Sequence, residues 1–195
     1  MPPRWLLVGL GNPGPQYAET RHNAGARCVA RLARRHGIEL RAKRTYSLGL
    51  GEIGGTLVAL ARPRVFMNES GRAVALLLRH LSLEPSHLLI VCDDLDLPLG
   101  HLRLRPGGGH GGHNGLRSIM EAIGTSDFAR LRIGIGRPTR NGVPITEPEA
   151  IAAYVLSVPP PQEKARLEEA IELACQALET VVTRGLEAAM NIYNR

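Results

Sequence analysis

The amino-acid sequence predicts an α/β fold, a single-domain three-layer sandwich in which helices flank a mixed, mostly parallel central sheet. Short apolar runs typical of buried strands alternate with segments of helical periodicity, which is the pattern of this class. Two strand-like runs joined through Gly54-Gly55 indicate a hairpin, so an antiparallel pair joins the parallel strands. The 195 residues contain neither an internal repeat nor a low-complexity linker, and we therefore expect one domain over 1–195.

The first half of the chain supplies the first strand, a helix, the hairpin and a second helix. The run from Trp5 to Leu10 ends beside a glycine and is typical of a buried strand, whereas the prolines and glycines of 11–21 indicate a loop. Asn23 is a candidate cap for the helix that follows, because an asparagine side chain accepts hydrogen bonds from the first free N–H groups of a helix. The expected elements are a strand over 5–10, a helix over 23–35, hairpin strands over 44–53 and 56–61, and a helix over 70–81.

The second half continues the alternation of strands and helices. The run from Leu88 to Cys92 is the clearest buried strand. A long segment has apolar residues at steps of four and three from Leu167 to Val181, which indicates an amphipathic helix packed on the core. The expected elements are strands over 88–92, 102–104 and 131–135, helices over 116–123 and 162–183, a glycine-rich loop over 107–112 and a second loop over 137–148.

Charge and cysteine content limit the partners and the compartment. A formal charge of +6 makes a polyanion a reasonable partner, while 4% aromatic residues disfavour a protein that binds single strands by repeated base stacking. The odd cysteine count, Cys28, Cys92 and Cys175, argues against a disulfide framework. The chain begins without the long apolar region of a signal peptide, and its apolar stretches are too short to span a membrane. We therefore expect a cytoplasmic protein without a membrane partner.

The first glycine-rich segment resembles a dinucleotide-binding motif but does not fit one. Gly9 to Gly14 matches the G-x-G-x-x-G pattern, which requires a helix to open at the glycines. Pro13 and Pro15 flank the third glycine, and helical periodicity begins only near residue 23. The loop instead places Asn12 at the carboxyl end of a strand and His22 at its own far end, where α/β sheets usually have their sites.

The second constellation is a run of acids after the strand that begins at Leu88. Asp93, Asp94 and Asp96 crowd one strand end, where carboxylates need hydrogen bonds, a counter-charge or a function. One interpretation is a turn with a cap, and another is an aspartate that orients a histidine. A third is a metal site with His110 and His113, although these histidines lack the helical spacing that would direct both at one ion.

The third constellation is the glycine loop over 107–112 with the strand before it. Its glycines allow backbone N–H groups to form an anion-binding concavity, and Arg103 and Arg105 alternate beside it in a way that suits phosphates. No Walker lysine follows the loop, which excludes a nucleotide hydrolase of that type. No G-x-S-x-G elbow occurs, which argues against the common serine hydrolases.

Taken together, five segments resemble the bacterial-type peptidyl-tRNA hydrolase family in order and spacing. They span 8–25, 66–71, 93–100, 103–119 and 128–138, and the resemblance covers about Leu6 to Gly185. It implies a metal-independent carboxylic ester hydrolase that frees tRNA from the peptide in peptidyl-tRNA during ribosome rescue. It also implies recognition of the acceptor end of tRNA by a monomer that needs no cofactor and no obligatory protein partner.

The resemblance also implies a role for individual residues. His22 matches the general base that activates water, and Asp93 matches the acid that orients it. Asn12 matches a catalytic asparagine that stabilises the oxyanion. The remaining matches are substrate-binding positions in the cleft at Asn68, Asn114, Tyr17 and Met67, and tRNA-phosphate positions at Arg105 and Arg132, with Arg103 as a helper.

Three other functions stay open on the residues alone. The first is an RNA-binding relative without catalytic activity. The second is a metal hydrolase built on Asp93, Asp94, Asp96, His110 and His113, and the third is a protein that binds a phosphorylated small molecule on the glycine loop. The segment around 142–146 and the tail after Gly185 match the family less well than the rest.

Overall fold

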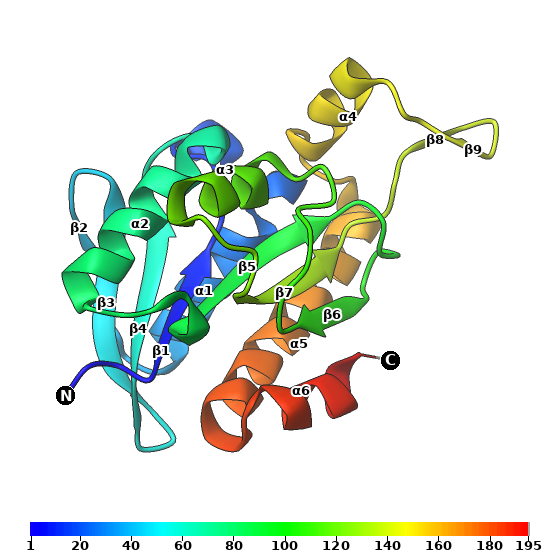
Figure 1. The fold of residues 1–195 in the computed structure, drawn as a ribbon. Helices are drawn as coiled ribbons and strands as arrows, with labels where there is room; N and C mark the ends of the chain where they lie inside the picture. Colours follow the sequence, from blue (N-terminus) through cyan, green and yellow to red (C-terminus); the bar gives the residue numbers. More distant parts are fainter. Residues whose placement is uncertain (195) are drawn as a thin grey trace.

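The computed structural model describes residues 1–194, and within them seven strands form one sheet in the order β2-β3-β4-β1-β5-β7-β6 (Figure 1). The strands are β1 (Trp5–Gly9), β2 (Arg41–Ala42), β3 (Tyr46–Ile53), β4 (Thr56–Pro63), β5 (Leu88–Asp94), β6 (Leu102–Arg105) and β7 (Ala129–Gly134). The central strands β4, β1, β5 and β7 run parallel, while β2, β3 and β6 pair antiparallel at the two sides. The predicted mixed sheet with a parallel centre is confirmed. The last residue of the expected domain over 1–195 lies outside the described residues.

Helices cover both faces of the sheet and form a three-layer sandwich (Figure 1). One face carries α1 (Ala24–Arg35), α5 (Pro161–Arg184) and α6 (Leu186–Tyr193), and the other carries α2 (Ser70–Leu81) and α3 (Asn114–Ile123). Side chains along β1 alternate between the two faces. Leu7 packs into the apolar core under α1, α5 and α6, while Leu6 and Val8 pack into the core under α2 and α3. A strand that is apolar at every position is buried on both faces.

Several short elements were not predicted from the sequence. The segment expected to be a loop over 137–148 contains a small hairpin, β8 (Thr139–Arg140) with β9 (Val143–Pro144), and leads into α4 (Pro148–Val155). Val155 is the buried residue of α4 and Ala189 that of α6, so neither helix has the apolar stripe from which helices are predicted. The prediction of a plain loop over 137–148 is therefore wrong.

Close backbone contacts fix the start of α1 against the sheet. A Cβ atom on Gly25 would lie 2.0 Å from the carbonyl oxygen of Val91, so only glycine permits this approach between α1 and β5. Asn23 precedes α1, but its side chain does not cap the helix as predicted. It accepts from the backbone N–H of Asn12 at 2.8 Å and donates to the Asn12 carbonyl at 3.0 Å, and so ties the first loop to the helix start.

The three cysteines are buried and carry no disulfide. The Sγ atoms of Cys28 on α1 and Cys175 on α5 lie 3.8 Å apart. Across residues 1–194, none of the helices combines the length and the apolar character needed to cross a bilayer.

Candidate active site

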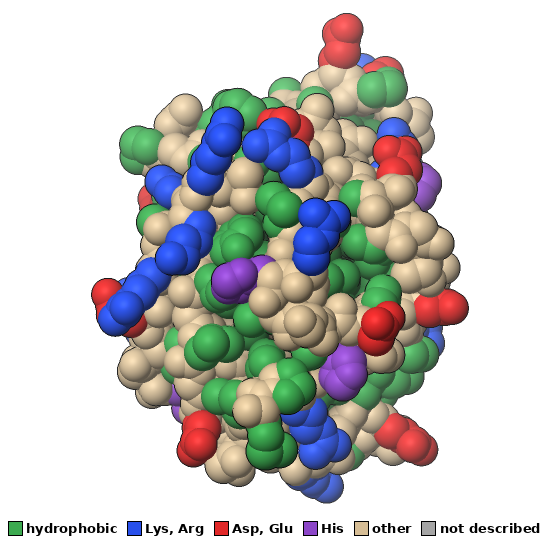
Figure 2. Space-filling model, turned by 60° about the vertical axis from the view of Figure 1, so that its left-hand side comes forward, with side chains coloured by type: hydrophobic (Ala, Val, Ile, Leu, Met, Phe, Trp, Pro, Cys, Tyr) green, Lys and Arg blue, Asp and Glu red, His purple; other side chains and the backbone are tan. Residues whose placement is uncertain are grey.

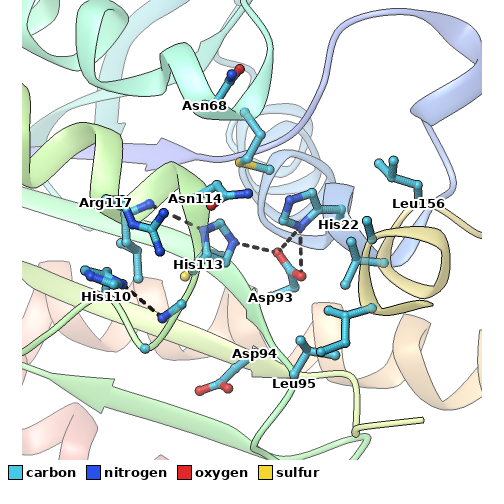
Figure 3. A pocket seen from close by; sticks show the side chains of 18 of the residues that line it. His22, Asn68, Asp93, Asp94, Leu95, His110, His113, Asn114, Arg117 and Leu156 are labelled. Carbon is cyan, nitrogen blue, oxygen red and sulfur yellow. Dashed lines mark hydrogen bonds and ion pairs between the residues drawn. The ribbon is translucent and has the colours of Figure 1, made fainter. Parts of the chain in front are cut away.

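A cleft of about 1010 Å³ opens at the carboxyl ends of the parallel strands (Figure 3). Its walls come from the first loop, the turn before α2, the start of α3, the acids at and after the end of β5, and α4. The expected residues that line it are Asn12, Tyr17, His22, Met67, Asn68, Asp93, Asn114 and Arg132. Arg103 and Arg105 stand outside the lining, on β6. The fold thus gathers the first set in one cavity and keeps the β6 arginines beside it.

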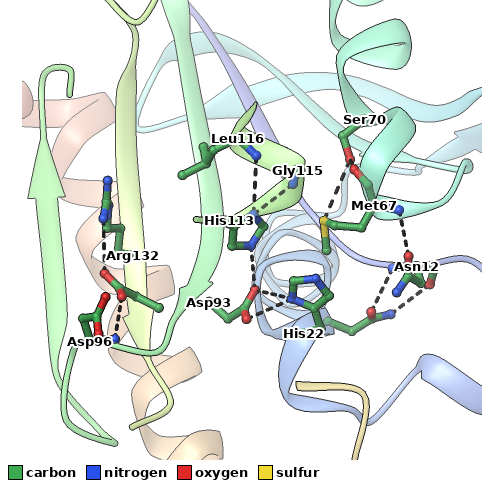
Figure 4. Close-up of polar contacts among 12 residues, drawn as sticks. Asn12, His22, Met67, Ser70, Asp93, Asp96, His113, Gly115, Leu116 and Arg132 are labelled. Carbon is green, nitrogen blue, oxygen red and sulfur yellow. Dashed lines mark hydrogen bonds and ion pairs between the residues drawn. The ribbon is translucent and has the colours of Figure 1, made fainter. Parts of the chain in front are cut away.

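His22 and Asp93 form the central pair of the cleft (Figures 3 and 4). His22 lies in a short 3-10 turn directly before α1, and its Nδ1 atom is 2.9 Å from both carboxylate oxygens of Asp93 at the end of β5. A carboxylate accepts hydrogen bonds, so Nδ1 carries the proton and Nε2 keeps its lone pair.

Opposing effects set the acid–base properties of this pair. Burial of the His22 imidazole disfavours its charged form, but the Asp93 carboxylate outweighs burial and raises the pKa of His22 above its ordinary value of 6.5. Burial alone would raise the pKa of Asp93, yet the imidazoles of His22 and His113 hold that pKa well below its usual range. Asp93 is therefore ionised at neutral pH while 3% exposed.

His113 contacts the same carboxylate with a second imidazole, a role that was not predicted from the sequence. Its Nε2 atom lies 2.9 Å from Asp93 Oδ1, and its Nδ1 accepts from the backbone N–H groups of Gly115 and Leu116 at 3.1 and 3.4 Å. Since Nδ1 is an acceptor, Nε2 must carry the proton and donate it to Asp93. His113 thus caps α3 and braces Asp93. Its place directly before a helix start was the available signal, but histidine is not a common cap.

Asn12 is oriented by the backbone of the opposite wall. Its side-chain oxygen accepts from the Met67 N–H at 2.7 Å, which fixes the orientation of the amide and leaves Nδ2 as a donor (Figure 4). The side chains of Asn68 and Asn114 are exposed in the cleft and form no hydrogen bond with the rest of the described chain. Three amide groups are thus available to a ligand.

Arginines form an array on one face of β6 and β7. Arg103 pairs across the ladder with Arg132, and Arg105 pairs with Arg130, while Leu102 and Leu104 point into the core. Like charges directly opposite one another on neighbouring strands are destabilising unless an anion lies between them. The Nε atoms of Arg103, Arg130 and Arg132 are buried without a hydrogen-bond partner in the part of the chain that is described.

The array also holds the glycine loop. Arg130 and Arg132 both donate to the carbonyl of Gly109, at 3.0 and 2.9 Å, and Arg132 contacts Asp94 at 3.4 Å. Burial, and then the charge of Arg132, lower the pKa of Arg130, as expected where positive charge is incompletely compensated. Arg130 was not predicted as a site residue, because a single arginine inside a buried strand produces no recognisable sequence pattern.

The five-residue metal set considered from the sequence does not assemble. Asp96 pairs with Arg137 at 2.8 Å, and the half-buried His110 accepts from the Gly112 N–H. Among residues 1–194, the groups close enough to share an ion are His22, Asp93 and His113, within 4.8 Å of one another. Coordination through His113 Nε2 would require a proton on Nδ1, opposite two backbone N–H donors. This donor set therefore fits a hydrogen-bonded triad and not a cation.

Comparisons with known proteins show which family the whole chain is similar to. A family model described as peptidyl-tRNA hydrolase matches residues 6–195. The chain is 50% identical to the peptidyl-tRNA hydrolase of Chloroflexus aggregans over 97% of this chain and 98% of that protein. It is 47% identical to that of Desulforudis audaxviator over 97% and 92%. A crystal structure of peptidyl-tRNA hydrolase from Acinetobacter baumannii superposes with a TM-score of 0.88 at 40% identity, covering 97% of this chain and 94% of that chain.

Proposed function

Because the chain belongs to the peptidyl-tRNA hydrolase family, we propose that it hydrolyses the ester bond of peptidyl-tRNA by a metal-independent mechanism with His22 as the general base. The observation that carries this proposal is the His22–Asp93 pair, with both oxygens of a buried carboxylate 2.9 Å from Nδ1. That arrangement selects the tautomer whose Nε2 lone pair can accept a proton from water.

The reaction can be written with the residues in the cleft. His22 Nε2 removes a proton from a water molecule while the water oxygen attacks the ester carbonyl carbon. The resulting oxyanion accepts hydrogen bonds from the Nδ2 group of Asn12 and from the amide of Asn68 or Asn114. The tetrahedral intermediate then expels the ribose oxygen, which takes the proton from the imidazolium. Asp93 remains ionised throughout and stabilises the imidazolium.

The two ends of the substrate would contact different parts of the site. Tyr17, Met67 and Asn68 line the cleft and would contact the peptide. The arginine array would hold phosphates of the tRNA acceptor end, with Arg105 and Arg132 as the main contacts and Arg103 as a helper. Guanidinium groups suit phosphate because they donate parallel hydrogen bonds. The unpartnered Nε atoms and the cross-strand pairing of like charges support this assignment.

We further propose that the protein acts in the cytoplasm as a single-domain monomer without an obligatory protein partner. The reaction itself is tested by deacylation of N-acetyl-aminoacyl-tRNA with and without EDTA. We expect turnover that EDTA leaves unchanged. Tight tRNA binding without turnover would identify a non-catalytic relative, and loss of turnover in EDTA would identify a metal hydrolase. Affinity that does not depend on tRNA length would favour a small phosphorylated ligand.

A further inference from the structure

A second group of arginine and lysine side chains without ion-pair partners among the described residues lies towards the β2–β3 edge of the sheet, opposite the edge that carries the arginine array. We define the edge patch as Lys43, Arg44, Arg62 and Arg64. Lys43 and Arg44 lie in the loop between β2 and β3, and Arg62 and Arg64 lie at and just beyond the end of β4. In Figure 2, where the β2–β3 side comes forward, basic side chains form a row on this face of the molecule.

Hydrogen bonds order the backbone of the edge patch. The Arg64 N–H donates to the Thr45 carbonyl at 2.8 Å, and Arg64 Nη1 donates to the Lys43 carbonyl at 2.5 Å. The Lys43 N–H donates in turn to the Tyr46 carbonyl at 2.7 Å. These bonds join the two segments, so the four cations are presented by an ordered surface and not by a free loop.

The charge of the edge patch has no internal partner. None of its members forms an ion pair with another of residues 1–194, and the nearby Glu39 pairs with Arg41. Arg62 Nε is buried without a hydrogen-bond partner, and burial lowers the pKa of that guanidinium.

Three arginines of α1 differ, because each of them pairs with glutamates of α5. The pairs join Arg27, Arg31 and Arg35 to Glu168, Glu172 and Glu179. The edge patch thus concentrates positive charge that no acidic side chain of residues 1–194 neutralises.

The edge patch adjoins the cleft. β4 is parallel to β1 and β5, so its end lies at the edge of the sheet where the cleft opens. Arg64 precedes Phe66 by two residues, and Phe66, Met67 and Asn68 line the cleft. The cleft therefore has a cationic surface on each side, the array on β6–β7 and the edge patch on the β2–β3 loop and the end of β4.

We propose that the edge patch binds the phosphodiester backbone of an RNA outside the cleft. The backbone belongs either to the body of the tRNA whose end occupies the cleft or to a separate RNA. The first source rests on the proposed function, whereas the second does not. Arginine and lysine contacts to phosphate release counterions, so binding here must weaken as salt rises.

The test compares the wild type with Lys43→Gln/Arg44→Gln/Arg64→Gln. The Michaelis constant is measured at several salt concentrations for full-length N-acetyl-aminoacyl-tRNA and for a short substrate that ends in the same three nucleotides. Affinity for an RNA duplex without a single-stranded end is measured separately. If the edge patch holds the tRNA body, the Michaelis constant for full-length substrate rises about tenfold at low salt, and its salt slope falls by roughly three. The short substrate is unaffected.

Other outcomes decide between the two sources or reject the proposal. Weaker duplex binding with an unchanged Michaelis constant assigns the edge patch to a separate RNA. No change in either measurement overturns the proposal. If the wild type cleaves neither substrate, the proposed function fails, and duplex binding still tests the edge patch on its own.

Two further variants remove simpler explanations. Lys43→Gln/Arg44→Gln leaves the Arg64 tether to Lys43 intact, and it should show a smaller effect in the same direction. Arg4→Gln/Arg79→Gln/Arg184→Gln removes the same charge from exposed positions before β1 and in the last turns of α2 and α5. If this control weakens RNA binding as much as the edge-patch variant, net charge and not the patch is responsible, and the proposal is wrong.

Discussion

The Nδ1 atom of His22 lies 2.9 Å from both carboxylate oxygens of Asp93, although the two residues are 71 positions apart in the chain. The contact depends on Gly25, since its missing side chain allows the start of α1 to lie against β5. The His22–Asp93 pair is therefore held in place by the packing of α1 against β5.

Replacing Asp93 by asparagine should retain the shape of the site and remove its charge. The amide cannot stabilise the imidazolium and no longer selects the Nδ1–H tautomer. We expect kcat to fall by about 10²–10⁴, with little change in KM. Steady-state kinetics on N-acetyl-aminoacyl-tRNA measures both constants, and a KM increase without loss of kcat would contradict the assignment.

The pH dependence of kcat/KM should report on His22. A general base must be neutral, so activity is expected to fall as the pH drops through the His22 pKa, which Asp93 raises above 6.5. In Asp93→Asn the raising charge is gone and burial remains, so the acid limb should move to lower pH. The pH–rate profiles of the two proteins provide the comparison. An acid limb that stays in place in the variant would mean that another group titrates.

His113 combines two roles that substitutions can separate. His113→Ala removes both the cap of α3 and one donor to Asp93, whereas asparagine is a good cap but is too short to reach Asp93. We expect the alanine variant to lose about 1 kcal/mol of unfolding free energy and the asparagine variant to recover most of it. Both should have lower kcat than the wild type. Denaturant unfolding and kinetics together check this, and full activity of His113→Asn would remove the bracing role.

Arg105→Ala should weaken tRNA binding without altering the fold, because Arg105 is exposed on the edge strand β6. Loss of one phosphate contact reduces the slope of log Kd against log salt by about one. Arg132→Ala should show the same reduction and a further loss, because its guanidinium also holds the Gly109 carbonyl. Binding titrations at several salt concentrations test this, and an unchanged slope in both variants would show that these arginines do not contact phosphate.

Gly25→Ala should destabilise the protein through a backbone clash. The added Cβ would lie 2.0 Å from the Val91 carbonyl oxygen, so α1 must move, and overpacking of this kind typically costs about 1–3 kcal/mol. Gly109→Ala is the matched control, because its Cβ would meet no atom within 4 Å. Equal unfolding free energies for the two variants would contradict the packing argument.

The elements that were predicted correctly are those with a clear pattern of apolar residues bounded by turn-forming residues. The strands of the parallel core and the helix Ser70–Leu81 were predicted closely, because apolar periodicity and flanking turns define them. The short helices α4 and α6 were missed, since each buries little. The resemblance to the family, not local pattern, identified His22 and Asp93 as partners, and the contact between them exists only once β1 and β5 are neighbours.

The parts of the site that were missed depend on contacts formed by the fold. His113 reaches Asp93 because α3 starts beside the end of β5, and Arg130 faces Arg105 through the register of β6 and β7. The edge patch likewise joins residues from two segments that the β3–β4 pairing brings together. No local spacing encodes these relationships.

The most direct test of the account is single-turnover deacylation of N-acetyl-aminoacyl-tRNA by His22→Ala, with tRNA affinity measured on the same preparation. We predict that the rate constant falls by about 10²–10⁴ while Kd for tRNA remains within about twofold of the wild type. A His22→Ala protein that cleaves at the wild-type rate would show that another group activates the water.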